Sequence, residues 1–487
     1  MRLFSIPWRI RTHSSIVLLQ PVLTVLLLMS AAVSTQRIQA QTPTVVMNDQ
    51  DIIQPVTRRI GLNIGSINYY DNGQVLKNLI GSINPGFEPL IDSQIWVVQT
   101  AGTTTTFQDP DQYDGQPANY WAGGTFSVVA SQSGGAEQGC TGAIVSNTGP
   151  NYPEAGRTTY TNPVFTTSAC PGPYSVGDIV ILSKTTSPTP ETWWEASEGG
   201  PWASITGGGK LLSDTTDLCA TCGSQALELN ATTAGSTAGI LSYFDTAPDV
   251  DIFVLMNGAY QISFWAKSAS GSPTLAVTAE RQSAGGFNCG NQTQALTATW
   301  TLYTLQCSAS ETAKTTTPGN AYVSVIASGG AAYLDNLSFQ KTGTNTTNTT
   351  VFRDEVFTTL QNFYNLQSGG DHAILRDWLG QNGENYDNWT APSYAHKPTS
   401  SGGGYFVGPG GSGVVQLSIA DYLNLCKALG VEPSLEVPVT ISTQDASSLI
   451  EFLAGPVSSA GGARRAALGE TEPWTSSFDT ILLSFCN

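Results

Sequence analysis

Residues 260–267 read Tyr-Gln-Ile-Ser-Phe-Trp-Ala-Lys, a stretch in which large apolar and aromatic residues alternate with polar ones. Alternation with a period of two is typical of a β-strand that buries one face. Four further stretches rich in β-branched and aromatic residues predict strands at 274–278, 300–305, 322–326 and 333–338. Turns rich in Gly, Ser, Asn and Pro separate them, and this spacing predicts an antiparallel β-sandwich.

The composition indicates an exported protein that binds neither nucleic acid nor an anionic membrane. The chain has 487 residues, and its 20 Lys and Arg against 37 Asp and Glu give a net charge of −17. Only 12% of the residues are charged, about half of the usual share of roughly 25%. Because nucleic acids and anionic membranes are bound through Lys and Arg, we exclude both as partners. The length allows two or three domains, each with its own core.

Residues 1–40 read as a secretory signal peptide. Arginines precede an apolar run at residues 16–33, small residues follow it, and cleavage is expected after Ala40. The alternative is an uncleaved membrane anchor, because the run approaches the ~20 residues that span a bilayer. Gln20 and Pro21 interrupt the run and favour cleavage. We therefore predict a secreted or extracytoplasmic protein.

The eight cysteines of an exported chain favour disulfide bonds between residues that are close in the sequence. The spacing suggests three pairs, namely Cys140 with Cys170, Cys219 with Cys222, and Cys289 with Cys307. The Cys-x-x-Cys pair at 219–222 could instead be half of a zinc site or a redox motif. The sequence has no second such pair and only 3 His, so we expect no metal there.

Three stretches of the predicted sandwich carry a family resemblance. They are residues 258–267 (Gly-Ala-Tyr-Gln-Ile-Ser-Phe-Trp-Ala-Lys), 300–304 (Trp-Thr-Leu-Tyr-Thr) and 332–337 (Ala-Tyr-Leu-Asp-Asn-Leu). They resemble the CenC-type carbohydrate-binding jelly rolls, whose opening strand carries a motif like Asn-Pro-Gly-Phe-Glu, here at 84–88. The resemblance implies that residues 82–341 bind a polysaccharide or oligosaccharide. It also implies a structural calcium, although no Asp-rich loop identifies its site; no other cofactor is expected.

Sugar-binding surfaces place aromatic rings against sugar rings and hydrogen-bonding groups against hydroxyls. The candidates for the aromatic contact in the sandwich are Trp193, Trp194 and Trp202. Trp265 and Trp300 are further candidates, but most aromatic residues of such a domain lie in its core. We therefore expect Trp265 and Trp300 to be packed there.

The early position of the 84–88 motif implies an insertion in the sandwich at about residues 101–190. Two strands are predicted inside it, at 120–129 and 174–182. We interpret the insertion as a small β subdomain with a structural role. A polar, low-complexity linker at 342–350 follows the sandwich.

Beyond the linker the hydrophobic pattern changes to alternating strands and helices. Helices are predicted at 351–363, 418–430 and 442–453, and strands at 372–378, 432–439 and 478–485. This alternation predicts βαβ units and a parallel sheet. One strand is missing before the first of these helices, and residues 59–65 supply it, so we assign residues 56–81 to the first strand and helix.

Five stretches in this region carry a second resemblance. They are residues 373–378, 385–389, 421–433, 446–455 and 465–474. Their order and spacing resemble the catalytic TIM barrel of α-L-arabinofuranosidase-like glycoside hydrolases. The expected fold class is therefore multidomain β plus α/β, with an antiparallel β jelly-roll sandwich inserted in the N-terminal half of an incomplete (β/α)₈ barrel. Barrel strands two to four are expected within 351–487.

The resemblance places both catalytic glutamates beyond the last residue. A retaining glycosidase needs two carboxyl groups about 5–5.5 Å apart, and in a barrel these converge at the C-terminal ends of the strands. In the family, the strand matched by 481–487 runs into the acid/base Glu, whereas this sequence ends at Asn487. We therefore expect no catalytic residue and no hydrolysis. Glu436 is expected to form an ion pair, and Arg376 has a salt bridge with Asp377 or Glu436 as its structural alternative.

The resemblance carries over residues that would position a sugar. Asn487 matches the Asn that bonds a sugar hydroxyl, and Arg376 matches an active-site Arg after the second strand. Asn388 and Trp389 match a loop position near the sugar. The main interpretation is a secreted glycoside hydrolase-like protein that acts on or binds plant-type polysaccharide and is inactive as this chain. The alternatives are a non-catalytic carbohydrate-binding module and a surface adhesive protein.

Overall fold

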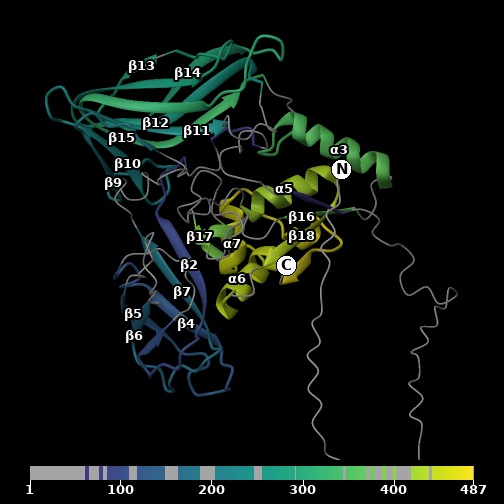
Figure 1. Cartoon of the computed structure of the whole chain (residues 1–487). Helices are drawn as coiled ribbons and strands as arrows, with labels where there is room; N and C mark the ends of the chain where they lie inside the picture. Colours follow the sequence, from purple (N-terminus) through teal and green to yellow (C-terminus); the bar gives the residue numbers. More distant parts are fainter. Residues whose placement is uncertain are drawn as a thin grey trace, which may run out of the picture. The chain divides into compact units, whose positions relative to one another are not determined.

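The structure is a computed structural model of the whole chain (Figure 1). The residues that the structure describes are 61–64, 76–80, 85–108, 118–148, 163–186, 203–245, 255–290, 292–343, 347–368, 373–377, 386–390, 399–401, 418–437 and 441–485. The predicted signal peptide at 1–40 and the candidate residues Trp193, Trp194, Trp202 and Asn487 lie outside them. Within these ranges, no helix has both the length and the apolar character needed to cross a membrane.

Eight strands form an antiparallel β-sandwich. Their bounds are β8 Ala203–Ser204, β9 Lys210–Asp214, β10 Ala226–Ala231, β11 Thr237–Asp245, β12 Asn257–Arg281, β13 Gln292–Ala295, β14 Thr301–Ser310 and β15 Ala321–Lys341. Every pairing among them is antiparallel. All five strands predicted from the alternating pattern are present, because β12 and β15 each contain two of them.

The two long strands, β12 and β15, bend and contribute to both layers of the sandwich. Layer A contains the first part of β12 (257–268) and the second part of β15 (331–341), together with β14, β10 and β9. Layer B contains the second part of β12 (274–281) and the first part of β15 (321–328), together with β13, β11 and β8. Pairing is irregular at the bend, where Gly271 has a φ of +73°. A side chain is strained at that φ, so glycine permits the turn from one layer to the other.

One hydrophobic core lies between the layers. In layer A, Tyr260, Ile262 and Phe264 are buried, and in layer B the same core receives Leu275 and Val277. The intervening residues of both strand segments are half-buried or exposed. Because burial of each large apolar side chain stabilises the fold by about 1.5–3 kcal/mol, the period-two pattern fixes which face of each strand points inward.

A second sheet is built mainly from the segment predicted to be an insertion. Its strands are β2 Leu90–Val97, β3 Thr106–Gln108, β4 Thr125–Ala130, β5 Thr141–Asn147, β6 Val164–Thr167, β7 Ile179–Thr186 and β17 Thr399–Ser401. The order is β17-β2-β7-β4-β5-β6-β3, and only the β17–β2 pair is parallel. Trp96, Phe107, Trp121 and Phe126 belong to its own core.

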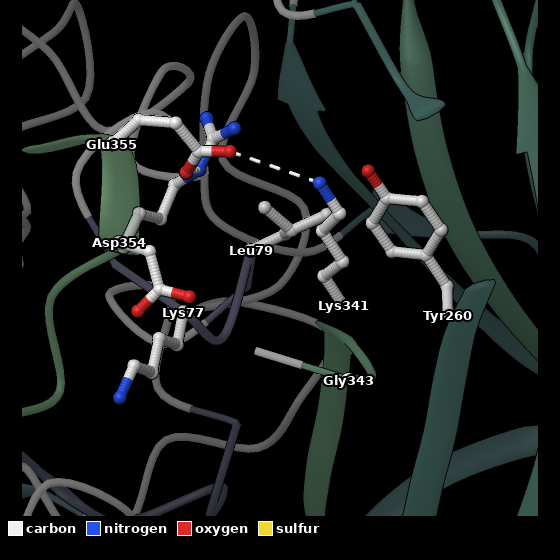
Figure 2. Close-up of a pocket in the computed structure, with 8 residues that line it drawn as sticks. Lys77, Leu79, Tyr260, Lys341, Gly343, Asp354 and Glu355 are labelled. Carbon is white, nitrogen blue, oxygen red and sulfur yellow. Dashed lines mark ion pairs between the residues drawn. The ribbon is translucent and has the colours of Figure 1, made fainter. Parts of the chain in front are cut away.

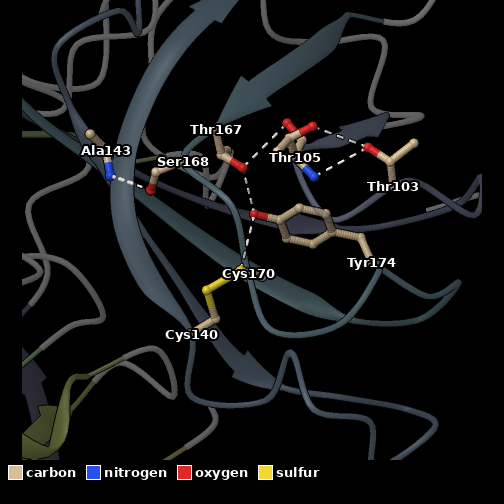
Figure 3. Close-up of a disulfide and its surroundings, with 8 residues drawn as sticks. All are labelled: Thr103, Thr105, Cys140, Ala143, Thr167, Ser168, Cys170 and Tyr174. Carbon is tan, nitrogen blue, oxygen red and sulfur yellow. Dashed lines mark hydrogen bonds between the residues drawn. A yellow bond between two sulfur atoms is a disulfide. The ribbon is translucent and has the colours of Figure 1, made fainter.

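The predicted disulfide bonds are confirmed, and one of them closes the second sheet (Figure 3). Cys140 and Cys170 join the β5 side of the sheet to the chain after β6. The phenol oxygen of Tyr174 lies 2.8 Å from Thr167 Oγ1 and 3.6 Å from the Cys170 sulfur. Burial raises the pKa of Tyr174 to about 12, so this phenol stays neutral and serves as a structural hydrogen-bonding group.

The third sheet is parallel, and its strands follow one another in chain order. Its strands are β1 Gly61–Ile64, β16 Ile374–Asp377, β18 Glu432–Val437 and β19 Leu482–Phe485. Each neighbouring pair is parallel. The helices that accompany it are α3 Asp354–Ser368, α4 Tyr386–Trp389, α5 Ile419–Leu429, α6 Thr443–Ala454, α7 Ala460–Ala467 and the 3₁₀ turn η3 Trp474–Ser476.

The predicted helix boundaries follow from capping residues. The Ser418 hydroxyl accepts a hydrogen bond from the Asp421 amide at 3.1 Å, and Ser442 accepts one from Asp445 at 3.0 Å. Each bond satisfies one of the amides that a helix start leaves without a partner. Gly430 ends α5 with a φ of 69°, a left-handed conformation that glycine adopts without strain.

One expectation for this region is met in part, and another needs correction. The described residues provide four parallel strands, the number that the incomplete barrel was expected to contribute, and they form no closed (β/α)₈ barrel. Residues 76–80, assigned to a first barrel helix, are not helical: Leu76 bridges Phe352, and Asn78 bridges Gln340. The Asn78 side chain accepts a hydrogen bond from the Phe339 amide at 2.9 Å, which ties this segment to the end of β15.

The end of the expected linker is packed. Asn348 is buried, and its amide group donates to the carbonyl of Phe352 at 2.8 Å and to Asp354 Oδ1 at 2.9 Å. Thr350 donates from its hydroxyl to Asn348 Oδ1 at 2.7 Å. These bonds shape the turn that leads into α3.

Candidate functional site

The outer face of layer B carries four polar and aromatic residues in one line across its strands. Tyr243 of β11 stands opposite Tyr322 of β15, and Tyr322 stands opposite Glu280 of β12. Asn288 bridges Glu280 on its other side. We call these four residues the layer B row.

The layer B row points away from the core because of the strand period. Ala321 and Val323 are buried in the sandwich core, so Tyr322 between them in β15 faces outward. Tyr243, Glu280 and Tyr322 are half-buried, and Asn288 is exposed. The row is therefore open to a ligand from solvent.

Hydrogen bonds order the carboxylate at the middle of the row. The Tyr322 hydroxyl donates to Glu280 Oε1, and the Asn288 amide donates to Glu280 Oε2 at 2.9 Å. Burial, with help from the Glu280 carboxylate, raises the pKa of Tyr322 to about 12, so the phenol is a neutral donor at ordinary pH. The rings of Tyr243 and Tyr322 meet edge to face, with centroids 6.1 Å apart.

This combination is suited to a polyhydroxylated ligand. Tyrosine rings offer apolar faces to the C–H groups of a sugar ring, while a carboxylate and an amide bond its hydroxyls. All four groups are held by one another before any ligand arrives, which reduces the entropy lost on binding. Their alignment depends on strand register, so no local sequence pattern predicts it.

Arg376, expected near a sugar, forms an ion pair with Glu436. The Arg376 Nε donates to Glu436 Oε1 at 2.8 Å, and its Nη2 contacts the same oxygen. The Glu436 amide donates to Asp377 Oδ1 at 2.6 Å. Both carboxyl groups are buried at the C-terminal ends of β16 and β18, and burial raises the pKa of Asp377 well above its usual range. The salt-bridge alternative for Arg376 is thus the arrangement found.

Trp389, Trp265 and Trp300 lie in surroundings that differ from those expected from the sequence. Trp389 is 1% exposed and belongs to the core of the parallel-sheet region. Asn388 lies in α4, but its side chain is outside what the structure describes. Trp265 and Trp300, expected in the sandwich core, are half-buried and lie outside that core cluster. Trp265 faces outward because its neighbours Phe264 and Ala266 take the inward positions of β12.

A buried ion cluster closes one end of the sandwich. Arg281 donates to Glu311 Oε1 at 2.8 Å and to Asp245 Oδ2 at 2.7 Å, and all three side chains are inaccessible or nearly so. Glu311 also accepts from the backbone amides of Met256 at 2.8 Å and Phe287 at 2.9 Å. The two carboxylates are therefore fully engaged in holding strands and loops together, and we assign them a structural role.

The resemblance implies a structural calcium, and one group of buried oxygen atoms could bind it. These atoms belong to residues 87–88, 224–225 and 335–336, which lie close to the Cys219–Cys222 bond. Glu88 accepts bonds from the Ser224 amide at 2.9 Å and from its hydroxyl at 2.6 Å. The Gln225 amide donates to the carbonyl of Phe87 at 2.8 Å. Buried oxygens of Gln225, Asp335 and Asn336 have no hydrogen-bond partner among the described residues.

This donor set fits a calcium ion. Calcium takes six to eight oxygen ligands from carboxylates, amides and carbonyls, and two buried carboxylates with two amide oxygens supply that chemistry. Burial raises the pKa of Asp335 to about 8, and the Glu88 charge adds to the rise. Glu88, Gln225, Asp335 and Asn336 would hold the ion. The described residues include no group of three or more His, Cys, Asp or Glu that could hold a metal, so the fit depends on the amides.

A pocket of about 80 Å³ lies beside the end of β15 and the start of α3 (Figure 2). Lys341 Nζ and Arg353 Nε both approach the Glu355 carboxylate, at 3.7 and 3.6 Å. The Lys77 ammonium donates to the Asn348 carbonyl at 2.6 Å. The pocket is far smaller than the roughly 300–1,000 Å³ of typical ligand sites. Its charged groups already contact one another or a backbone carbonyl, so we assign it no ligand.

No family model and no curated protein matches this sequence. Among solved structures, the chain is similar to the enzymatically active domain of bacteriophage CBA120 tailspike protein 4, at 14% identity over 31% of this chain and 20% of that one, with a TM-score of 0.22. The chain thus spans one fifth of that domain.

The chain is also similar to two carbohydrate-binding modules. A family 61 module in complex with β-1,4-galactotriose is 13% identical over 31% of this chain and 95% of the module, with a TM-score of 0.21. The CBM22-1 xylan-binding domain of Paenibacillus barcinonensis Xyn10C is 20% identical over 31% of this chain and 90% of the domain, also at 0.21. Likenesses at such TM-scores establish neither the fold nor the function of this chain.

Proposed function

We propose that this protein binds plant-type polysaccharide through the layer B row. The observation that carries the proposal is the cross-strand alignment of Tyr243, Tyr322, Glu280 and Asn288, which sets two rings beside a hydrogen-bonded carboxylate and an amide. A neutral sugar chain fits this surface better than an anion, because its charged group is a carboxylate. The partner is therefore a polysaccharide or oligosaccharide, and the primary role is binding.

Affinity electrophoresis tests this proposal. The full chain is run through native gels that contain xylan, arabinan or β-1,4-galactan, next to gels without polysaccharide. We expect retarded migration in at least one polysaccharide and a smaller retardation for Tyr322→Ala. Equal migration in all gels would overturn the proposal.

The parallel sheet supports a second candidate function, that of a glycoside hydrolase-like barrel. Strands β1, β16, β18 and β19 are neighbours in chain order, and each connection contains at least one helix, as in strands one to four of an arabinofuranosidase-like (β/α)₈ barrel. Asp377 and Glu436 lie at the strand ends where catalytic carboxylates of such barrels stand. Both are buried and engaged in structural bonds, so we assign neither a role as acid or nucleophile.

An activity assay tests the hydrolase candidate separately from sugar binding. The full chain is incubated with 4-nitrophenyl α-L-arabinofuranoside, and the released 4-nitrophenol is compared with that from a buffer blank. We expect no release above the blank. Release that Glu436→Gln abolishes would instead give this carboxylate a catalytic role.

We also propose that the protein is exported. Three disulfide bonds among the described residues support this, because such bonds persist in oxidising compartments. Expression with residues 1–40 attached in a secreting host tests the proposal. We expect the protein in the medium with a new N-terminus near Gln41, and retention of the whole chain in the cell membrane would contradict it.

A further inference from the structure

The outer face of layer A carries rows of uncharged hydrogen-bonding side chains. Gln261 of β12 stands opposite Gln306 of β14 on one side and Gln340 of β15 on the other. The next outward position, Ser263, is flanked in the same way by Thr304 and Ser338. The Gln306 amide donates to Gln261 Oε1 at 2.8 Å, so the amide row is ordered. These rows carry no charge, in a chain with a net charge of −17, and they suit a neutral ligand.

Aromatic rings adjoin these rows on the same face. Trp265 is the next outward residue of β12 after Ser263, and it pairs with the exposed Leu302 of β14. Trp300 and Tyr333 lie nearby with centroids 6.1 Å apart and ring planes within 20° of parallel. Tyr333 stands opposite Lys267, the last outward residue of this stretch of β12.

A hydrogen bond to Asp217 holds the ring of Trp300 in place. Its Nε1 donates to Asp217 Oδ1 at 3.1 Å, and Asp217 also forms an ion pair with Lys267. The Lys267 ammonium lies 5.8 Å from the centroid of the Tyr333 ring. A ring fixed in this way offers a stacking surface without losing side-chain freedom when a ligand arrives.

We propose that this outer face of layer A is a second carbohydrate-binding site, distinct from the layer B row. An extended, uncharged glycan would stack on Trp300 and Trp265 and bond its hydroxyls to the amide and hydroxyl rows. Lys267 lies six residue steps from Gln261 along β12, and at about 3.3 Å per step the platform is roughly 20 Å long. The two faces point away from the shared core, so one chain would hold two glycan chains at once. The second site does not depend on the layer B row.

Titration calorimetry of the full chain tests the proposal, with xylohexaose, cellohexaose and linear arabinohexaose as probes. For at least one probe we expect two molecules bound per chain. Trp300→Ala and Tyr322→Ala should each reduce the number to one, and the double variant should bind none. Binding that survives Tyr322→Ala and is lost in Trp300→Ala would support layer A alone, and the reverse would support layer B alone. One molecule per chain whose binding is lost in Tyr322→Ala and survives in Trp300→Ala, or no binding of any probe, would overturn the second site.

Two milder variants keep the test decisive if Trp300→Ala fails to fold. Trp300→Phe keeps an aromatic ring but loses the bond to Asp217, and Gln306→Ala removes an exposed amide from the row. We expect each to weaken binding at the second site by several-fold to about tenfold while leaving the first site unchanged. Val145→Ala, an exposed position on the separate sheet of β5, is the matched control and should bind two molecules. Unchanged affinity in both variants would overturn the proposal.

Discussion

The hydroxyl of Tyr322 donates a hydrogen bond to the carboxylate of Glu280, which stands directly opposite it on the neighbouring strand of layer B. The bond joins β12 and β15, two neighbouring strands of this layer. It also fixes an aromatic ring and a charged acceptor side by side in a half-exposed position. The pair is the centre of the proposed polysaccharide site.

Substitutions of this pair should separate ring stacking from hydrogen bonding. Tyr322→Ala removes both and should weaken oligosaccharide binding by about tenfold or more. Tyr322→Phe keeps the ring and should lose only several-fold, while Glu280→Gln keeps the shape and loses the charge. Titration calorimetry with the tightest-binding oligosaccharide gives the three affinities. Equal affinities for Tyr322→Ala and the unaltered protein would remove Tyr322 from the site.

Calcium should stabilise the sandwich, and the effect should grow with pH. The pKa of Asp335 is raised in the fold to about 8 from an ordinary value of 3.8. A raised pKa means that the stability contribution is complete below about pH 4 and is lost as the pH rises to about 8. A bound cation would balance the carboxylate charge, so the gain in melting temperature on adding calcium should be larger at about pH 8 than at about pH 5.

Thermal unfolding in calcium and in a chelator, at both pH values, measures this effect. The control is Asp335→Asn, which keeps the size of the side chain and removes its charge. This variant should show a flatter pH dependence in the chelator and a smaller response to calcium. A calcium response that is the same at both pH values would contradict the role of Asp335.

Arg281 should be among the residues whose loss destabilises the sandwich most. Arg281→Met leaves the buried carboxylates of Asp245 and Glu311 without this cation and should lower the free energy of unfolding by about 3–5 kcal/mol. The double variant Arg281→Met with Glu311→Gln should lose less, because one charge is removed as well. Urea unfolding followed by near-ultraviolet circular dichroism measures both. A loss below about 0.5 kcal/mol for Arg281→Met would contradict this account.

The Cys140–Cys170 bond should matter more for stability than the Cys219–Cys222 bond. The first closes 30 residues and the second only 3, and the entropy removed from the unfolded chain grows with the length of the closed loop. Replacing both Cys140 and Cys170 by Ala should lower the stability of their sheet by about 3–4 kcal/mol. The matched pair of Ala substitutions at 219 and 222 should cost less, and the opposite ranking in urea unfolding would refute the loop-length argument.

The strands and helices were predictable where burial and capping leave a local pattern. Alternation in 260–267 identified β12, and Ser418 and Gly430 identified both ends of α5. The same alternation carries a signal that the expectation for Trp265 missed. Trp265 shares its strand face with Gln261 and Ser263, so it had to point outward when Phe264 pointed into the core.

The candidate site was not predictable in the same way. Tyr243, Glu280 and Tyr322 are tens of residues apart, and only the register of three strands aligns them. Register depends on how bends such as the one at Gly271 are placed, which no single stretch of sequence specifies. Arg376 and Glu436 show the same limit: each was recognised as a candidate, but their pairing needed two parallel strands side by side.

Hydroxyl-radical footprinting of the full chain, with and without a saturating oligosaccharide, tests the proposed site most directly. Mass spectrometry reads the oxidation of each tyrosine side chain. We predict that the sugar protects Tyr243 and Tyr322, whereas Tyr120, in the turn before β4 of the second sheet, is oxidised equally in both samples. Unchanged oxidation of Tyr243 and Tyr322 at saturating sugar would contradict the assignment of polysaccharide binding to layer B.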